Sequence, residues 1–408
     1  MPYKQGWETL VNNEHKKLNV PNKQEKNQTC LDSAEREGLR PKGNVPNLRF
    51  PEFQGEWEKC KLVDIITFST TRVNSSELNK DNYVSTENML QDYQGIVKAK
   101  SVPEDVNVVS FSCGDVLISN IRPYLKKVWK ATFNGGCSSD VFVLKANDNI
   151  ESDYLHYVIA NDKFINFVMS GAKGVKMPRG DKKQMETYSL SLPQIQEQHK
   201  IARLLSLLDE RISTQNKIIE DLKKLKSAIS HILFSDKCTK HLSDIANVIM
   251  GQSPSSNVYN DQGIGIPLVQ GNLDISNGKT TPRLYTAEFN QTAEEGNIIL
   301  TVRAPVGEVA RATKKVCLGR GVCAIIPLEE NMADFIYQYL TFYKFMWRRY
   351  EQGSTFTSIN GSDVRNILCP KVRNVSILTL LDGKINIEER VVKLYQSQKQ
   401  NMLYHMFI

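Results

Sequence analysis

The sequence contains no apolar run that approaches the ~18–20 residues needed to span a bilayer, so we do not expect a membrane protein. The first ten residues, MPYKQGWETL, lack the apolar core of a secretory signal, and we expect a cytoplasmic protein. The 8 cysteines form no Cys-x-x-Cys pair, and the 6 histidines show no metal-ligand spacing. These absences favour reduced, buried thiols and predict no metal site in this chain.

Motifs for catalysis and nucleotide binding are also missing. NGKT (277–280) looks like the end of a phosphate loop, but Gly271 and Gly278 are too far apart for the glycines of that loop. The Gly-x-Gly pairs at 263–265 and 319–321 lack the third glycine of a dinucleotide-binding fingerprint. Because there is no Pro-Pro dipeptide, there is no Asn-Pro-Pro-Tyr loop for methylating an amino nitrogen. We therefore expect that the chain is not an enzyme by itself.

The sequence does contain an internal repeat. Because a repeat determines how the chain divides into structural units, we consider it before the secondary-structure patterns. Four segments recur in the same order and at a nearly constant offset along the chain. They are KLVDII (61–66) with HLSDIA (241–246), GDVLIS (114–119) with GNIILT (296–301), IRPYLKKVWKAT (121–132) with VRAPVGEVARAT (302–313), and the loop Gly171–Asp181 with Gly353–Asp363.

A long helical pattern follows each copy, and its apolar residues step alternately by three and four, as in a coiled-coil seam. The first seam comprises Ile201, Leu205, Leu208, Ile212, Gln215, Ile219, Leu222, Lys226, Ile229 and Leu233. The second, in the last part of the chain, comprises Leu378, Leu381, Ile385, Glu388, Val392, Tyr395, Lys399, Met402 and Met406. Two such helices in one chain predict an antiparallel coiled coil. The alternative is two unrelated amphipathic helices in separate cores.

Polar residues occupy matching seam positions, Gln215 with Glu388 and Lys226 with Lys399. Such residues lower stability but fix the register of the helices. We predict two cross-pairs in the antiparallel arrangement, Gln215 with Lys399 and Glu388 with Lys226.

Each repeated arm is predicted to be a mixed α/β domain. Short runs rich in Val, Ile, Phe and Thr indicate strands, and one helix is expected per arm, over 153–170 and 333–352. The predicted organisation is a polar N-terminal extension (1–46), a first arm (47–192), a first spacer helix (193–236), a second arm (237–369) and a second spacer helix (370–408).

The net charge of +7 is spread over the chain without a polycationic segment, so only local clusters can indicate nucleic acid. Basic and hydrogen-bonding residues gather at corresponding places of both arms, in Gly-containing loops that suit a curved phosphate surface. Our candidate DNA-binding residues are Arg122, Lys126, Lys127, Lys130, Lys173, Lys176, Arg179, Lys182, Lys183, Arg303, Arg311, Lys314, Lys315, Arg320, Thr355, Thr357, Ser358 and Asn360. Any one cluster alone is also compatible with a solvated loop.

At four segments the sequence resembles the DNA specificity subunit of type I restriction–modification enzymes. They are NVPNLRFPEFQGEWEKCKL (44–62), LPQIQEQHKIARLLSLLDERI (192–212), TVRAPVGEVA (301–310) and GRG (319–321). The resemblance covers about residues 44–408. It implies two α/β target-recognition domains that each read half of a bipartite sequence in double-stranded DNA, joined by helices that form an antiparallel spacer.

The resemblance also implies partners. Two adenine methyltransferase subunits that bind S-adenosylmethionine would dock on the helices, and a separate motor–nuclease subunit that uses ATP and Mg²⁺ would cut unmodified DNA. One departure concerns the second helix boundary, where Pro370 and Asp382 are closer in sequence than Pro193 and Asp209. That boundary also lacks the Glu-Gln and Ile-Ala pairs of the first, at 197–198 and 201–202.

Two other functions are compatible with the residues. One is a coiled-coil adaptor whose duplicated arms bind proteins, and the other is an autonomous DNA-binding regulator. Binding that falls steeply with salt separates a DNA-binding chain from the adaptor.

Overall fold

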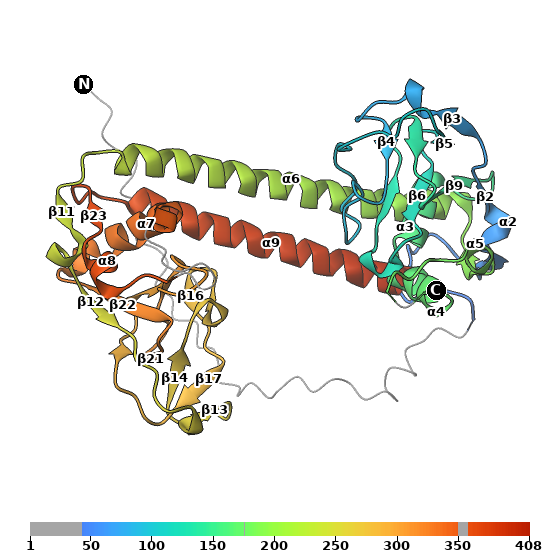
Figure 1. Ribbon diagram of the computed structural model, residues 1–408. Helices are drawn as coiled ribbons and strands as arrows, with labels where there is room; N and C mark the ends of the chain where they lie inside the picture. Colours follow the sequence, from blue (N-terminus) through green and yellow to red (C-terminus); the bar gives the residue numbers. More distant parts are fainter. Residues whose placement is uncertain (1–42, 175, 350–357) are drawn as a thin grey trace, which may run out of the picture.

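The computed structural model describes residues 43–174, 176–349 and 358–408, and it shows two α/β arms at the ends of two long helices. The helices are α6 (Ile195–Phe234) and α9 (Ser376–Met406), which lie side by side along most of their length (Figure 1). The first arm lies at the beginning of α6 and the second at its end. This arrangement confirms the mixed α/β fold with two repeated domains and a helical spacer.

Arm one contains two four-stranded sheets, in the strand orders β2-β9-β6-β7 and β3-β5-β8-β4, and a two-stranded ribbon, β1-β10. Its strands are β1 (Glu58–Lys61), β2 (Ile66–Phe68), β3 (Arg72–Asn74), β4 (Tyr83–Val84), β5 (Asn107–Phe111), β6 (Val116–Ser119), β7 (Val128–Lys130), β8 (Gly135–Cys137), β9 (Val141–Ala146) and β10 (Ser189–Leu192). Its helices are α2 (Leu62–Ile65), α3 (Ser152–Ile159), α4 (Asp162–Ser170) and α5 (Lys182–Glu186), with short 3₁₀ turns η1 (Ser75–Glu77) and η2 (Pro123–Leu125).

Arm two contains a six-stranded sheet, β12-β22-β19-β20-β16-β15, a five-stranded sheet, β13-β17-β14-β21-β18, and the ribbon β11-β23. Its strands are β11 (Lys240–His241), β12 (Ala246–Met250), β13 (Tyr259–Asn260), β14 (Ile266–Val269), β15 (Ile275–Ser276), β16 (Lys279–Thr280), β17 (Leu284–Thr286), β18 (Thr292–Ala293), β19 (Ile298–Thr301), β20 (Val309–Arg311), β21 (Val316–Leu318), β22 (Val322–Pro327) and β23 (Leu368–Cys369). Its helices are α7 (Ala333–Tyr343) and α8 (Gly361–Arg365), with 3₁₀ segments η3 (Leu242–Asp244), η4 (Ser256–Val258), η5 (Asn272–Asp274), η6 (Glu330–Met332) and η7 (Lys344–Arg349).

The two arms repeat individual side-chain contacts as well as strands. In arm one, Lys130 of β7 forms an ion pair with Asp153 of α3. In arm two, Arg311 of β20 forms an ion pair with Asp334 of α7, with 2.5 Å between Nη2 and Oδ1. The offset from Lys130 to Arg311 equals that from Asp153 to Asp334. The sequence repeat is therefore accompanied by an equivalent ion pair between a strand and a helix in each arm.

The helix predicted over 153–170 is two helices in the structure, α3 and α4. The break falls at Asn161, whose side-chain oxygen accepts a hydrogen bond from the backbone N–H of Lys163 at 2.9 Å. An asparagine that caps a helix in this way starts a new helix and ends the preceding one. The second predicted helix, over 333–352, is α7 followed by the 3₁₀ segment η7, and its last residues lie outside the described chain.

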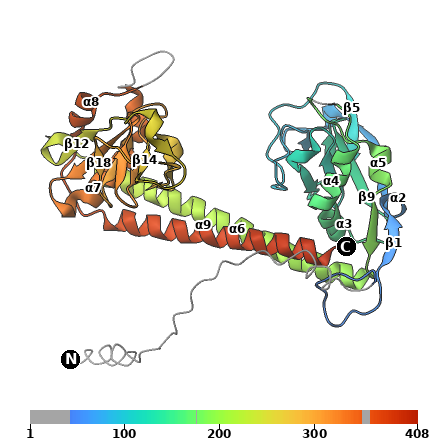
Figure 2. The same ribbon diagram turned by 90° about the horizontal axis from the view of Figure 1, so that it is seen from below.

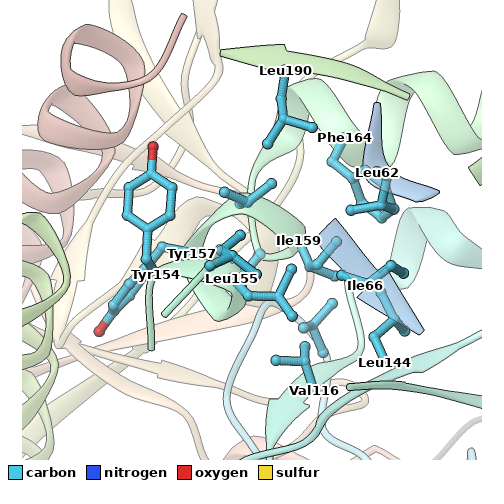
Figure 3. Packing of buried hydrophobic residues seen from close by; sticks show 14 of the residues in the cluster. Leu62, Ile66, Val116, Leu144, Tyr154, Leu155, Tyr157, Ile159, Phe164 and Leu190 are labelled. Atoms are coloured by element: carbon cyan, nitrogen blue, oxygen red, sulfur yellow. The ribbon is translucent and has the colours of Figure 1, made fainter. Parts of the chain in front are cut away.

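Each arm has its main apolar core between a sheet and its helices, and the ends of α6 and α9 complete it. Figure 3 shows this packing in arm one, where Leu155 and Ile159 of α3 meet Ile66, Val116 and Leu144 of the sheet. Seam residues enter both cores. Ile201, Leu205, Met402 and Met406 join the core of arm one, and Ile229, Leu233 and Leu378 join that of arm two.

The two helices run antiparallel. Near the start of α6, Asp209 binds Lys399 near the end of α9, and near the end of α6, Lys226 binds Asp382 near the start of α9. Both Nζ–Oδ1 distances are 2.6 Å. Between these ion pairs, the apolar seam residues Ile212, Ile219, Leu222, Ile385 and Val392 form a separate cluster.

The two predicted cross-pairs are wrong, although the helices are antiparallel. Gln215 binds Glu388, and the lysines bind Asp382 and Asp209. The physical reason is that equivalent residues of two antiparallel repeats meet where a pseudo-twofold axis passes between them. Lys226 and Lys399 lie well beyond that axis on their own helices, so each faces an aspartate near the beginning of the other helix.

No helix in the described ranges is long and apolar enough to cross a membrane. The same ranges contain no group of three or more His, Cys, Asp or Glu side chains that could hold a metal ion. Burial raises the pKa of the Cys317 thiol to about 11 and that of Cys323 to about 12, so both stay protonated at neutral pH.

Candidate nucleic-acid interface

In each arm the structure brings together the two regions that contain the candidate residues. In arm one, the backbone N–H of Arg122 donates to the carbonyl of Pro178 at 2.7 Å, and that of Gly180 donates to Asn120 at 2.8 Å. In arm two, the N–H of Ile359 donates to the carbonyl of Val302 at 3.0 Å. The strand-end corner that carries Arg122 or Arg303 is thereby joined to the loop before α5 or α8.

Three of the candidate cations in arm one are bound within the arm. Lys126 forms a 2.8 Å ion pair with Asp162, and Lys130 binds Asp153. Lys127 donates to the Thr86 carbonyl at 2.5 Å, and its pKa is lowered by burial and by the nearby charge of Arg122. These three ammonium groups are occupied by contacts within the arm, whereas the Arg122 side chain is exposed.

The loop before α5 and the first turn of α5 present several cations to solvent. Lys173 is exposed although its Nζ lies 3.0 Å from Asp181, and Arg179 forms a 3.1 Å ion pair with Asp140. Lys176 and Lys183 are exposed, and Lys182 lies over the Phe68 ring at 4.6 Å from its centroid. Ion pairs this exposed contribute little to stability, so these cations can exchange an acidic partner for a phosphate at low cost.

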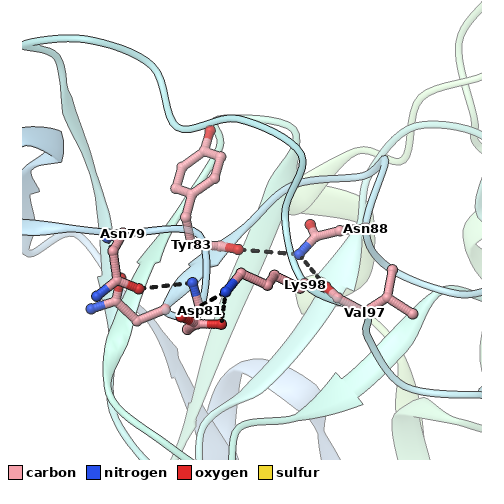
Figure 4. Close-up of polar contacts among 7 residues, drawn as sticks. Asn79, Asp81, Tyr83, Asn88, Val97 and Lys98 are labelled. Carbon is pink, nitrogen blue, oxygen red and sulfur yellow. Dashed lines mark hydrogen bonds and ion pairs between the residues drawn. The ribbon is translucent and has the colours of Figure 1, made fainter.

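An outer loop of arm one is held by a buried asparagine (Figure 4). The side-chain Nδ2 of Asn88 donates to the carbonyls of Tyr83 and Val97, at 3.1 and 2.9 Å. Beside it, Lys98 pairs with Asp81 at 2.8 Å. Sequence reasoning did not single out this loop, because its contacts join residues that no motif connects.

In arm two the candidate residues separate into two groups. Arg311 is bound by Asp334 and lies over Tyr337, Lys315 binds Glu294 at 2.6 Å, and Lys314 lies over Tyr285. Arg303 and Arg320 instead line a common cleft.

The polar candidates of arm two, unlike Arg303 and Arg320, do not line this cleft where the structure describes them. Ser358 pairs through its backbone with Arg303, and Asn360 is the N-cap of α8, where its side chain accepts from Ser362 N and Asp363 N. Thr355 and Thr357 lie outside the described residues. Asn360 is therefore placed to stabilise α8, a role that its position before a short helix could have indicated.

The cleft has a volume of about 660 Å³ and is polar. Its lining residues include Ser253, Ser255, Gln270, Asn272, Leu273, Asp274, Arg283, Arg303 and Arg320. The GRG turn (319–321) lies against Gln270 at this cleft, so closely that a Cβ atom at Gly321 would collide with the carbonyl oxygen of Gln270. The glycines thus let the turn lie against Gln270 while Arg320, between them, remains exposed.

Arg283 and Asp274 are functional candidates that sequence reasoning missed. Arg283 directly precedes β17 and Asp274 ends η5, and their side chains form an ion pair with 3.1 Å between Nε and Oδ1. Asp274 is buried, whereas Arg283 is exposed on the cleft. No periodicity or motif marks either residue, because the pairing depends on how η5 folds against the start of β17.

Comparison with known proteins identifies the class to which these arms belong. A profile of the type I restriction modification DNA specificity domain matches twice, over residues 54–224 and 235–392. The two matches cover the two arms and most of both helices. The chain therefore belongs to the family of type I restriction–modification DNA specificity subunits.

Individual relatives agree with this assignment. The chain is 30% identical over 366 residues to a putative type I restriction enzyme specificity subunit, MjaX, of Methanocaldococcus jannaschii, over 80% of this chain and 85% of the relative. In fold it is similar to the type I restriction–modification S subunit of M. genitalium, with TM-score 0.61, 18% identity, and coverage of 89% of this chain and 99% of that chain. A chain from a structure of the type I R-M system gives TM-score 0.55 at 22% identity, over 86% of this chain and 97% of that chain.

Proposed function

We propose that this chain is the non-catalytic recognition subunit of a type I restriction–modification complex, in which each arm reads one half of a bipartite DNA sequence. In this proposal adenine methyltransferase subunits dock on the helix pair and bind S-adenosylmethionine. A motor–nuclease subunit that uses ATP and Mg²⁺ completes the complex. The observation that carries the proposal is the presence of two equivalent arms, with matching ion pairs, on an antiparallel helix pair.

The length of the spacer suits a split target. Helix α6 has 40 residues, which corresponds to about 60 Å at 1.5 Å per residue. Seen from below, both arms project from the same side of the helix pair (Figure 2). One turn of DNA rises roughly 34–36 Å, so two arms held this way can contact half-sites about one turn apart.

The helix pair also has a face that suits a docked partner. The interhelical ion pairs of Asp209, Lys223, Asp382 and Glu389 mark one side of the seam. Leu207, Leu380 and Ile387 each lie two residues before one of these groups, a rotation of about 200°, and so they lie on the opposite side. Ile218, Leu225, Ile232 and Leu394 extend this exposed stripe.

Such a row of exposed apolar side chains is unusual for a surface that faces only water, and it fits a helical partner. Leu380 is 73% exposed and Leu394 is 69% exposed. Leu380 follows Leu207 at the same offset at which Glu388 follows Gln215 in the two seams. The stripe thus includes equivalent positions of α6 and α9, and we propose one methyltransferase at each.

The Glu-Gln pair missing from the second boundary does not weaken this proposal. Glu197 forms an ion pair with Arg49, and Gln198 donates to the carbonyls of Asn149 and Pro193. Glu197 and Gln198 are both 1% exposed. Because they serve contacts within arm one, their absence from α9 removes nothing from the outer surface.

The proposal is tested by expressing the chain with its cognate methyltransferase and mapping methylated adenines on host DNA by long-read sequencing. We expect one split motif, with a gap of unspecified bases and one modified adenine in each half. A stable complex that methylates nothing, or a continuous motif, would contradict the proposal.

The adaptor and regulator alternatives give different results in a binding assay. A DNA-recognition subunit loses affinity steeply between about 50 and 200 mM salt, because phosphate contacts release counterions. An adaptor for proteins shows no DNA binding of this kind. Tight, sequence-specific binding by the chain alone would favour the autonomous regulator.

A further inference from the structure

Arg283 differs from the other two arginines of the cleft in being anchored through its side chain. Its Nε donates to Asp274 Oδ1 at 3.1 Å. Within the described part of the chain, the guanidinium groups of Arg303 and Arg320 have no ion-pair partner. The Asp274 contact therefore restricts the orientation of the Arg283 guanidinium, and no ion pair of this kind restricts Arg303 or Arg320 within the described residues.

The anchor is itself rigid. The side chain of Asp274 is 5% exposed, and its second oxygen, Oδ2, accepts the backbone N–H of Gln270 at 2.8 Å. A buried carboxylate is costly unless charged and hydrogen-bonding groups compensate it, so Asp274 requires Arg283 at this place. The pair contributes orientation more than it contributes stability.

The orientation exposes the recognition edge of the guanidinium. Nε is the donor nearest the backbone, so a bond from Nε leaves the end-on edge of the guanidinium, with one N–H from each of Nη1 and Nη2, available to a ligand. The Arg283 side chain is 59% exposed and lines the cleft. Two parallel N–H donors of this kind match the O6 and N7 acceptors of guanine in the major groove.

We propose that Arg283, positioned by Asp274, reads a guanine in the half-site of arm two. The inference rests on the proposed function, because it assumes that this arm binds DNA through the cleft. Arg303 and Arg320, which lack an anchor, bind phosphates and set the position of the arm on the duplex.

The inference assigns the guanine to one half-site only. At the offset that relates the two arms, Arg283 corresponds to the segment Ser101, Val102 and Pro103, so arm one has no arginine at the equivalent place. A change at Arg283 should therefore alter one half of the methylated motif and leave the other half intact.

The test uses the chain co-expressed with its methyltransferase, with methylation mapped for the parent chain and for Arg283→Ala, Arg283→Gln and Asp274→Asn. In the parent, we expect about 5- to 150-fold discrimination for guanine at one position. Arg283→Ala should reduce this to about 1, and Arg283→Gln should shift the preference to adenine, which glutamine contacts through N6 and N7. Asp274→Asn should weaken discrimination at the same position, since it removes the anchoring charge.

Lys240→Gln is the matched control, because it removes one positive charge from an exposed position of arm two outside the cleft and should leave the motif unchanged. Binding of each complex to duplexes with single base changes provides the second measurement. Three results would overturn the inference. The first is a parent motif without guanine in either half. The others are an Arg283 variant that loses affinity uniformly with all discrimination preserved, or one that loses discrimination at every position. If the parent complex gives no split motif, the proposed function itself fails, and this result is visible before any variant is scored.

Discussion

Gln215 of α6 donates a hydrogen bond to the carboxylate of Glu388 of α9, and these two residues occupy the same position in their repeats. Equivalent residues of an antiparallel repeat can meet at one place only, the pseudo-twofold axis. The pair therefore marks the centre of the spacer, and it places a polar contact between the apolar residues of the central seam. A buried polar pair at such a site can fix the register of two helices.

Replacing one member of this pair should destabilise the protein, and replacing both should not. Glu388 is only 8% exposed, so Gln215→Leu leaves its carboxylate with Lys384 as its remaining partner. We expect a loss of about 1–3 kcal/mol for Gln215→Leu in urea unfolding. The double variant Gln215→Leu/Glu388→Leu should recover this loss, because an apolar pair fits the seam. A double variant less stable than the single one would show that the axis pair contributes net stability.

Much of the fold was predictable because it follows from periodicity. The four repeated segments and the three–four stepping of the seam predicted two α/β arms and an antiparallel helix pair. Periodicity does not specify which side chains meet, and the failure of the Gln215–Lys399 cross-pair shows this limit. The break at Asn161 was missed because apolar residues continue on both sides of it, and only the two non-helical residues Ala160 and Asn161 separate α3 from α4.

The candidate interface was predicted less completely than the fold. Composition finds clusters of cations, but it does not find the acidic residues that the fold places beside them. Lys126 and its partner Asp162 are far apart in the sequence, as are Lys315 and Glu294. The pair of Arg283 and Asp274 was missed for a related reason, since its significance depends on burial of the aspartate.

A charge placed on the apolar stripe should prevent docking without unfolding the chain. Leu380→Lys/Ile387→Lys changes two side chains that are 73% and 54% exposed, so the melting temperature should hardly move. Association with the methyltransferase should weaken about tenfold or more, because buried lysines would lack partners. Asn386→Lys, an exposed change on the same helix outside the stripe, is the control. Unchanged co-purification of the double variant would place the dock elsewhere.

Gly383, in α9, should be a site of stabilisation. A Cβ atom there would have no neighbour within 4 Å, so alanine adds helix propensity without a clash. We expect Gly383→Ala to raise the free energy of unfolding by about 0.5–1 kcal/mol. Gly321→Ala should do the opposite, because its Cβ would collide with the Gln270 carbonyl. Urea unfolding of both variants measures the contrast, and a destabilised Gly383→Ala would contradict this account of α9.

His156 of α3 should make the protein sensitive to mild acid. Its Nδ1 is buried and has no hydrogen-bond partner in the described chain. Burial, followed by the charge of Lys399, lowers its pKa from 6.5 to about 4. Between pH 6.5 and pH 4 the unfolded chain therefore binds a proton that the folded chain does not. The contribution of neutral His156 to the free energy of unfolding is fully present above pH 6.5 and is lost as the pH decreases through this window.

The size of this effect follows from the shift, and one variant isolates it. Each pKa unit corresponds to about 1.4 kcal/mol, so we expect a loss of about 1–3 kcal/mol by pH 4. His156→Gln keeps a polar side chain of similar length and cannot take up the proton, so its stability should change less between pH 6.5 and pH 4 than that of the parent. Thermal unfolding of both proteins across this range makes the comparison, in which titrating carboxylates contribute equally to each. Parallel stability profiles for parent and variant would show that His156 takes up its proton as readily in the folded chain as in the unfolded one.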